Sequence, residues 1–294
     1  MKRDKSLEEA AAKILRGEHS LNEKETPIQK FPKELSRWSK NKKSAQHIAK
    51  AGHEDDDPED DQVKVTQKSF RVKQLKPSQS TMQLPNALGM IYGMLDPSSS
   101  LKLGGDLECF ISKDGYIMDG HHRWIASGMI DPAAEVQGKL VNMPGEKLVK
   151  LLNVITVGKL GNFEGKPGTG SFTPFTNKDL IAKTLYEIGS SKDKFGSPEI
   201  RQPALVNWVT NNLNSKVRKI SFEQACELAG GIMAKNASQL TLKSPPFAMD
   251  RKDMPVIDKG KEASKAIKAL STGSVDWNNP ATSKTTDSLQ NKLK

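Results

Sequence analysis

The sequence predicts an α/β (α+β) protein: a small mixed-sheet domain, then a helical region, with disordered termini. Between residues 64 and 157, short apolar runs alternate with segments of helical spacing, which is typical of a small α/β sheet. From 177 to 243 only helical spacing recurs. Hydrophobic residues make up 35% of the 294 residues and lie mostly in this middle part, so the ends lack the apolar side chains that a core needs.

These patterns divide the chain into five parts. They are a helical, basic extension with an acidic linker (1–61), the sheet domain (64–157), a Gly-rich connector (158–176), the helical region (177–243) and an irregular tail (244–294).

The extension begins with a predicted short helix over 6–16 and a basic helical stretch over 32–50. The acidic run 54–61 follows and holds seven carboxylates. It lacks the glycine and the distant glutamate of an EF-hand loop, so a solvated linker is favoured over a cation site.

Within the sheet domain, strands and helices are expected in alternation. The predicted elements, in order, are a strand containing Val72 and Leu75, a helix from Met82 to Leu95, a strand over 108–112, a helix with its apolar spacing over 125–130, a strand over 136–140 and a helix over 145–153.

The connector contains Gly165 and Lys166, but Pro167 follows where a phosphate-binding Walker loop needs Ser or Thr. That motif is therefore absent. A lid over a bound nucleotide and a plain mobile loop are the two interpretations, and the plain loop is favoured.

The helical region is predicted to hold three helices, over 177–188, 198–213 and 221–230, the last with a capping box between Ser221 and Gln224. The segment 220–231 resembles the first helix and turn of a helix-turn-helix unit. The corresponding recognition helix, 232–240, has few polar side chains that could read bases and no arginine, so generic helical packing is favoured.

The densest group of chemically capable residues is Asp119-Gly120-His121-His122-Arg123, placed where a strand leads into a helix. A helix N-terminus presents unpaired N–H groups and positive dipole charge, so it stabilises a phosphate. A bland alternative makes Asp119 an N-cap and the histidines surface residues. The strand, turn and helix around the group favour the phosphate site.

This run resembles the motif of the ParB/sulfiredoxin-like superfamily, especially its free serine kinase branch and phage ParB-like domains. The resemblance covers residues 70 to about 157, and the segment 72–79 is similar to the family's first strand and Pro-containing turn. It implies that the motif opens a helix and binds nucleotide phosphates.

Departures from the family narrow the chemistry that the resemblance implies. His121 stands where sulfiredoxins carry their reactive cysteine, which argues against sulfinic-acid repair. Partitioning ParB proteins carry Gly-Glu-Arg-Arg instead. Gln79 stands where the serine kinase branch has a glutamate base, and an amide cannot take a proton.

The resemblance implies a nucleotide-binding protein, either a phosphotransferase or an NTPase, that takes ATP or CTP with Mg²⁺. Gly120, His122 and Arg123 would hold the phosphates. His121 and His122 would stabilise charge or relay a proton, and Asp119 would orient a histidine or bind Mg²⁺. The alternatives are a phage DNA-associated protein that touches DNA through its basic helical region, and an accessory protein without catalysis.

Composition sets outer limits on these functions. The net charge of +10 favours polyanion partners such as nucleic acid, although lysine-rich surfaces also serve solubility. Two cysteines cannot make a zinc site, and no protein metal site is predicted. No apolar run reaches the length of a membrane span and no signal core is evident, so a cytoplasmic location is expected, in the host if the protein is phage-encoded.

Overall fold

The computed structural model describes residues 63–156, 160, 170–192, 197–213, 219–248, 257 and 261–271. Within them, a mixed sheet with helices is followed by a helical region, which confirms the predicted α/β fold class. The two predicted N-terminal helices, the acidic run and most of the Gly-rich connector lie outside the described residues.

The strands of the described part form one five-stranded sheet in the order β1-β5-β3-β4-β2. β3 runs parallel to β5 and antiparallel to β4, β1 pairs antiparallel with β5, and β2 runs parallel to β4. The strand bounds are Val65–Arg71 for β1, Lys76–Pro77 for β2, Asp106–Ser112 for β3, Tyr116–Ile117 for β4 and Glu135–Val141 for β5.

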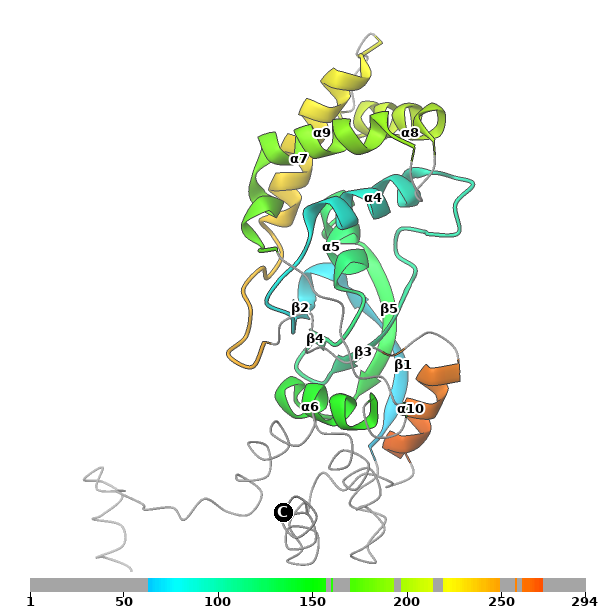
Figure 1. Ribbon diagram of the computed structural model, residues 1–294, viewed down its shortest axis with the longest axis vertical. Helices are drawn as coiled ribbons and strands as arrows, with labels where there is room; N and C mark the ends of the chain where they lie inside the picture. The colour runs from blue at the N-terminus through cyan, green and yellow to red at the C-terminus, as the bar shows by residue number, and fades with distance from the viewer. Residues whose placement is uncertain are drawn as a thin grey trace, which may run out of the picture.

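Helices cover both faces of this sheet (Figure 1). In chain order the bounds are Leu84–Leu95 for α4, His121–Ile130 for α5, Gly145–Ile155 for α6, Lys178–Ser190 for α7, Pro198–Asn212 for α8, Phe222–Ala237 for α9 and Lys261–Ser271 for α10. Short 3-10 turns, η1 at Val72–Gln74 and η3 at Thr173–Thr176, complete the described elements.

The two faces bury different apolar clusters, because side chains alternate along a strand. Cys109 and Ile111 of β3 face the larger cluster, which also contains buried residues of α4, α5, α7, α8 and α9. Phe110, between them, faces the smaller cluster with residues of α6 and α10. Figure 1 shows the same division: α7, α8 and α9 lie beyond α4 and α5, and α6 and α10 lie at the opposite end of the view.

The predicted strand through Val72 and Leu75 is wrong. The strand lies upstream, at β1, and Val72 begins the 3-10 turn η1. Val72 is fully buried and its carbonyl accepts a hydrogen bond from Trp124 Nε1 at 2.9 Å, so the chain bends toward α5 at this point. β1 escaped prediction because the side chains from Thr66 to Ser69 are all exposed, which gives no alternation of apolar and polar residues.

The segment 220–231 does not form the first helix and turn of a helix-turn-helix unit, since α9 runs without a break from Phe222 to Ala237, and this fits the favoured interpretation, generic helical packing. A β-carbon at Gly230 would lie 2.5 Å from the Lys178 carbonyl oxygen, so this glycine lets α7 and α9 pack closely. The glycine pair is a packing feature inside one helix. The predicted capping box of Ser221 and Gln224 is present at its start.

The tail predicted to be irregular contains one helix, α10. Its Ala266, Ala269 and Leu270 are buried in the smaller cluster, and the Val63 N–H donates to the Leu270 carbonyl at 2.8 Å. Small alanines at helical spacing among lysines gave the sequence pattern too little apolar contrast to reveal it.

No helix among the described residues is long and apolar enough to cross a membrane.

Candidate functional site

Gly120 is the N-cap of α5 and adopts a left-handed conformation, with φ of 74°. A β-carbon there would lie 3.1 Å from the Leu107 carbonyl oxygen, so both the left-handed backbone and the close approach of β3 favour glycine at this position. The cap has no side chain to accept the first N–H groups of α5, and the first turn contains no acidic residue. The run 119–123 therefore lies at the start of a helix, as its sequence predicts.

Asp119 lies directly before this cap. Its Oδ1 accepts the Gly120 N–H at 2.6 Å, which places the carboxylate beside the first turn of α5. Asp119 is therefore next to the helix start, and the N-cap position that the bland alternative gave it belongs to Gly120.

The two histidines both bind the loop 78–83, which leads from β2 to α4. His121 is 3% exposed, and its Nε2 accepts the Ser78 N–H at 3.2 Å. His122 Nε2 accepts the Gln83 N–H, also at 3.2 Å. An Nε2 that accepts a hydrogen bond carries no proton, so each ring with this contact has its donor on Nδ1. In this arrangement the histidines fasten a loop, and neither Nε2 can donate to a phosphate.

The same loop carries Gln79, which is 5% exposed and whose amide donates to the Thr81 carbonyl. Gln79 therefore directly follows Ser78, the residue whose N–H donates to His121 Nε2. Its side chain is a buried amide that holds the loop in shape.

Arg123 points from the first turn of α5 to β3. Its Nη1 donates to the Asp106 carbonyl at 2.5 Å and to Glu108 Oε2 at 3.3 Å. Its side chain is 20% exposed and lines a hollow at the surface.

A hollow of about 560 Å³ lies in front of Arg123. Two cationic side chains, Lys102 and Arg123, and two carboxylates, Asp106 and Glu108, contribute to its wall. The remaining lining residues are Ser100, Leu101 and Gly105. Lys102, Asp106 and Glu108 were not predicted from the sequence. The one signal near them is the run Gly104-Gly105-Asp106, in which two glycines and a charged residue come directly before an apolar strand.

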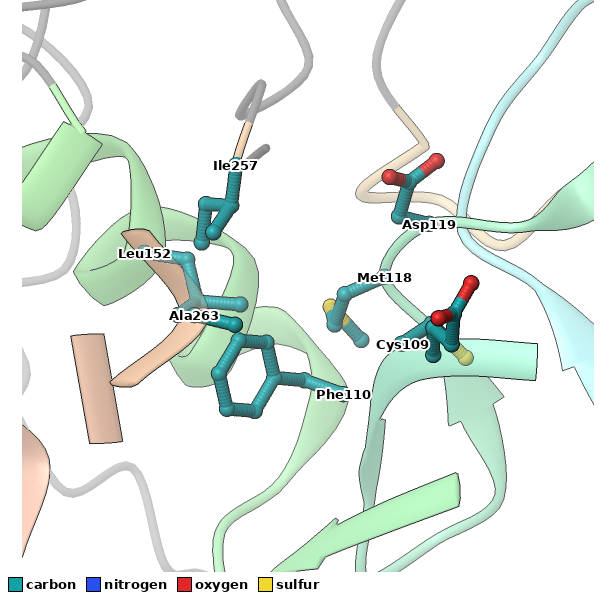
Figure 2. A pocket seen from close by; sticks show the side chains of 8 residues that line it. Cys109, Phe110, Met118, Asp119, Leu152, Ile257 and Ala263 are labelled. Carbon is teal, nitrogen blue, oxygen red and sulfur yellow. The ribbon is translucent and has the colours of Figure 1, made fainter. Parts of the chain in front are cut away.

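A second, narrow pocket, which Glu108 also lines, lies beside Phe110 and Met118 (Figure 2). Cys109 and Phe110 of β3 line it, together with Met118, which directly follows β4. Leu152, Ile257 and Ala263 line the opposite side, and Asp119 lies beyond Met118 on the strand-to-helix connection. The pocket is mostly apolar, with carboxylates near the start of α5.

Cys109 is 2% exposed beneath this connection. Burial raises the pKa of its thiol, and the carboxylates of Asp119 and Asp106 raise it further. The group stays protonated at neutral pH, so it supplies no thiolate nucleophile to the site.

Two remaining predictions concern metals and DNA. Among the described residues, no group of three or more His, Cys, Asp or Glu side chains is arranged to hold a metal ion. The basic helical region expected to touch DNA includes three cationic residues shortly before α9: Lys216 and Arg218 lie outside the described residues, and Lys219 is exposed.

A scan against protein-family models, a search of curated proteins and a search of solved structures found no match to this chain.

Proposed function

We propose that this chain is a nucleotide-binding protein of the ParB/sulfiredoxin-like kind, which holds the phosphates of ATP or CTP at the start of α5. One observation carries the proposal: the left-handed Gly120 begins a ten-residue helix without a side-chain cap, and Arg123 of its first turn faces a hollow of about 560 Å³. The first N–H groups of a helix have no carbonyl partner one turn earlier. Phosphate oxygens placed there can accept hydrogen bonds from them.

Two sources of positive charge near this helix start favour a phosphate ligand, against the carboxylates of Asp119, Asp106 and Glu108 that lie beside them. The helix dipole places partial positive charge at Gly120 and His121. Arg123 adds a planar fork of donors that matches two phosphate oxygens, and Lys102 adds a point charge in the same hollow.

Binding is the function that this site supports best, ahead of phosphotransfer. The side chain of Gln79 is a buried amide, and the histidine Nε2 atoms are engaged by backbone N–H groups. A hydroxyl acceptor therefore finds no general base at the loop after β2.

The test is calorimetry of the full chain with ATP, ADP, CTP and GTP, each with Mg²⁺. We expect Arg123→Ala to weaken binding of the preferred nucleotide by about ten- to hundredfold, because a charge-assisted hydrogen bond to phosphate contributes roughly 1.5–3 kcal/mol. Lys183→Ala is the control: it also removes one cation, from α7, which contributes no residue to the hollow, and Lys183 is 73% exposed.

Absence of binding of every nucleotide at millimolar concentration would reject the proposal. Equal losses in both variants would show that net charge, and no particular contact of Arg123, governs binding.

A further inference from the structure

Glu108 has an unusual backbone conformation. Its φ is 53°, and among the described residues no other non-glycine residue has a positive φ. The left-handed region is unfavourable for a glutamate, because its β-carbon crowds the following carbonyl. Such an outlier persists only where its surroundings hold it, and it is a reason to look for a function.

The conformation belongs to a bulge in β3. Asp106 pairs with Gln137 and Phe110 pairs with Lys139, so a step of four residues on β3 matches a step of two on β5. Asp106 Oδ1 accepts the Glu108 N–H at 2.7 Å and holds the bulge closed. Leu107 and Cys109, on either side of Glu108, are buried in the larger cluster, whereas the Glu108 side chain is exposed next to the bulge.

The Glu108 carboxylate forms an ion pair with Arg123. Glu108 Oε2 lies 3.3 Å from Arg123 Nη1, the atom that also donates to the Asp106 carbonyl. Glu108 lines both the hollow in front of Arg123 and the narrow pocket near Asp119, so it stands between them.

The two carboxylates of the hollow differ in their contacts. Asp106 is tied on both oxygens, through Glu108 N–H on Oδ1 and through Gln67 Nε2 on Oδ2 at 3.0 Å. The Glu108 side chain is 39% exposed. A phosphate that binds Arg123 from the hollow would displace this carboxylate from the guanidinium.

We infer that Glu108 determines which form of the nucleotide this site accepts: it competes with phosphate for Arg123 and favours a phosphate that carries a divalent cation. The inference rests on the proposed function. A bare polyphosphate brings several negative charges next to the carboxylate and is repelled by it. A phosphate-bound Mg²⁺ lowers that charge and offers the displaced carboxylate a partner, since Mg²⁺ in proteins is bound through one or two carboxylates together with substrate phosphates.

The experiment compares full-length wild type and Glu108→Gln by calorimetry. Each protein is titrated with ATP in EDTA and with ATP in excess Mg²⁺, and with CTP in the same two ways. Glutamine keeps the shape of the side chain and removes its charge. Glu187→Gln is the matched control, because Glu187 is a 59% exposed partner of Lys183 on α7.

We expect Glu108→Gln to tighten binding of the metal-free nucleotide about two- to fivefold, the range of a partly exposed charge interaction. The Mg²⁺ complex should gain less or lose affinity, so the preference for the complexed form falls. Glu187→Gln should leave that preference unchanged. Glu108→Asn, which tolerates the left-handed backbone, repeats the test if the glutamine variant folds poorly.

An unchanged preference in a well-folded Glu108 variant would overturn the inference alone. A wild type that binds neither form would reject the proposed function itself, and the inference with it.

Discussion

Two consecutive histidines at the start of α5 each accept a backbone N–H from the loop 78–83. Neighbouring residues of a helix point about a quarter turn apart, so the pair can reach both ends of one short loop. Ser78 is fully buried, and its hydroxyl donates to the Ile117 carbonyl at 2.6 Å. His121 therefore joins β2, β4 and α5 at the point where the site is assembled.

We expect His121→Ala to lower the free energy of unfolding by about 1–3 kcal/mol, because it leaves the buried Ser78 N–H without its acceptor. His121→Gln should recover much of that loss, since its Oε1 can accept where Nε2 did. Denaturant unfolding of the three proteins measures this. If glutamine is as destabilising as alanine, the Nε2 contact contributes little and the ring is needed only for its volume.

At the scale of single elements, the two adjacent glycines of α9 have different surroundings. A β-carbon at Gly230 would lie 2.5 Å from the Lys178 carbonyl oxygen, whereas one at Gly231 would have no atom within 4 Å. A glycine inside a helix costs roughly 0.5–1 kcal/mol relative to alanine, and the contact with α7 justifies that cost at Gly230.

Gly231→Ala should accordingly stabilise the protein by about 0.5–1 kcal/mol, and Gly230→Ala should destabilise it by about 1–3 kcal/mol through overpacking. Thermal melts followed by circular dichroism compare the two variants, each serving as the control for the other. A destabilising Gly231→Ala would indicate that the chain turns at this pair, as in a helix-turn-helix unit.

At the scale of the whole molecule, the sheet and the helical region share one apolar cluster. Met233 of α9 is fully buried in the same cluster as Trp124 and Ile125 of α5. Asn236 Nδ2 also donates to the carbonyls of Met129 and Ile130, at 3.0 and 3.1 Å, and satisfies the C-terminal end of α5. The helical region thus packs against α5, the helix that carries the candidate site, and binds its C-terminal end.

This sharing predicts that the two regions unfold together. Met233→Ala should cost about 2–5 kcal/mol, as expected for a large buried side chain cut to alanine. Hydrogen exchange should then accelerate by the same factor in peptides from β3 and from α9. Faster exchange in α9 alone would show that the sheet folds independently.

The sequence by itself determined the fold class, most of the described helices, and the place where α5 begins. These features depend on local periodicity, capping residues and one glycine, which act between residues a few positions apart. The run 119–123 was recognisable for the same reason, because its five residues adjoin in the chain.

Only the tertiary structure decided what those residues contact. Ser78 and His121 lie 43 positions apart, and Arg123 reaches Glu108 and Asp106 across a bulge that pairs with β5. The exposed strand β1 and the alanine-rich α10 are likewise specified by their packing partners, β5 for one and the smaller cluster for the other. Contacts between distant segments depend on how the whole chain packs. The local sequence pattern therefore does not predict which residues will form them.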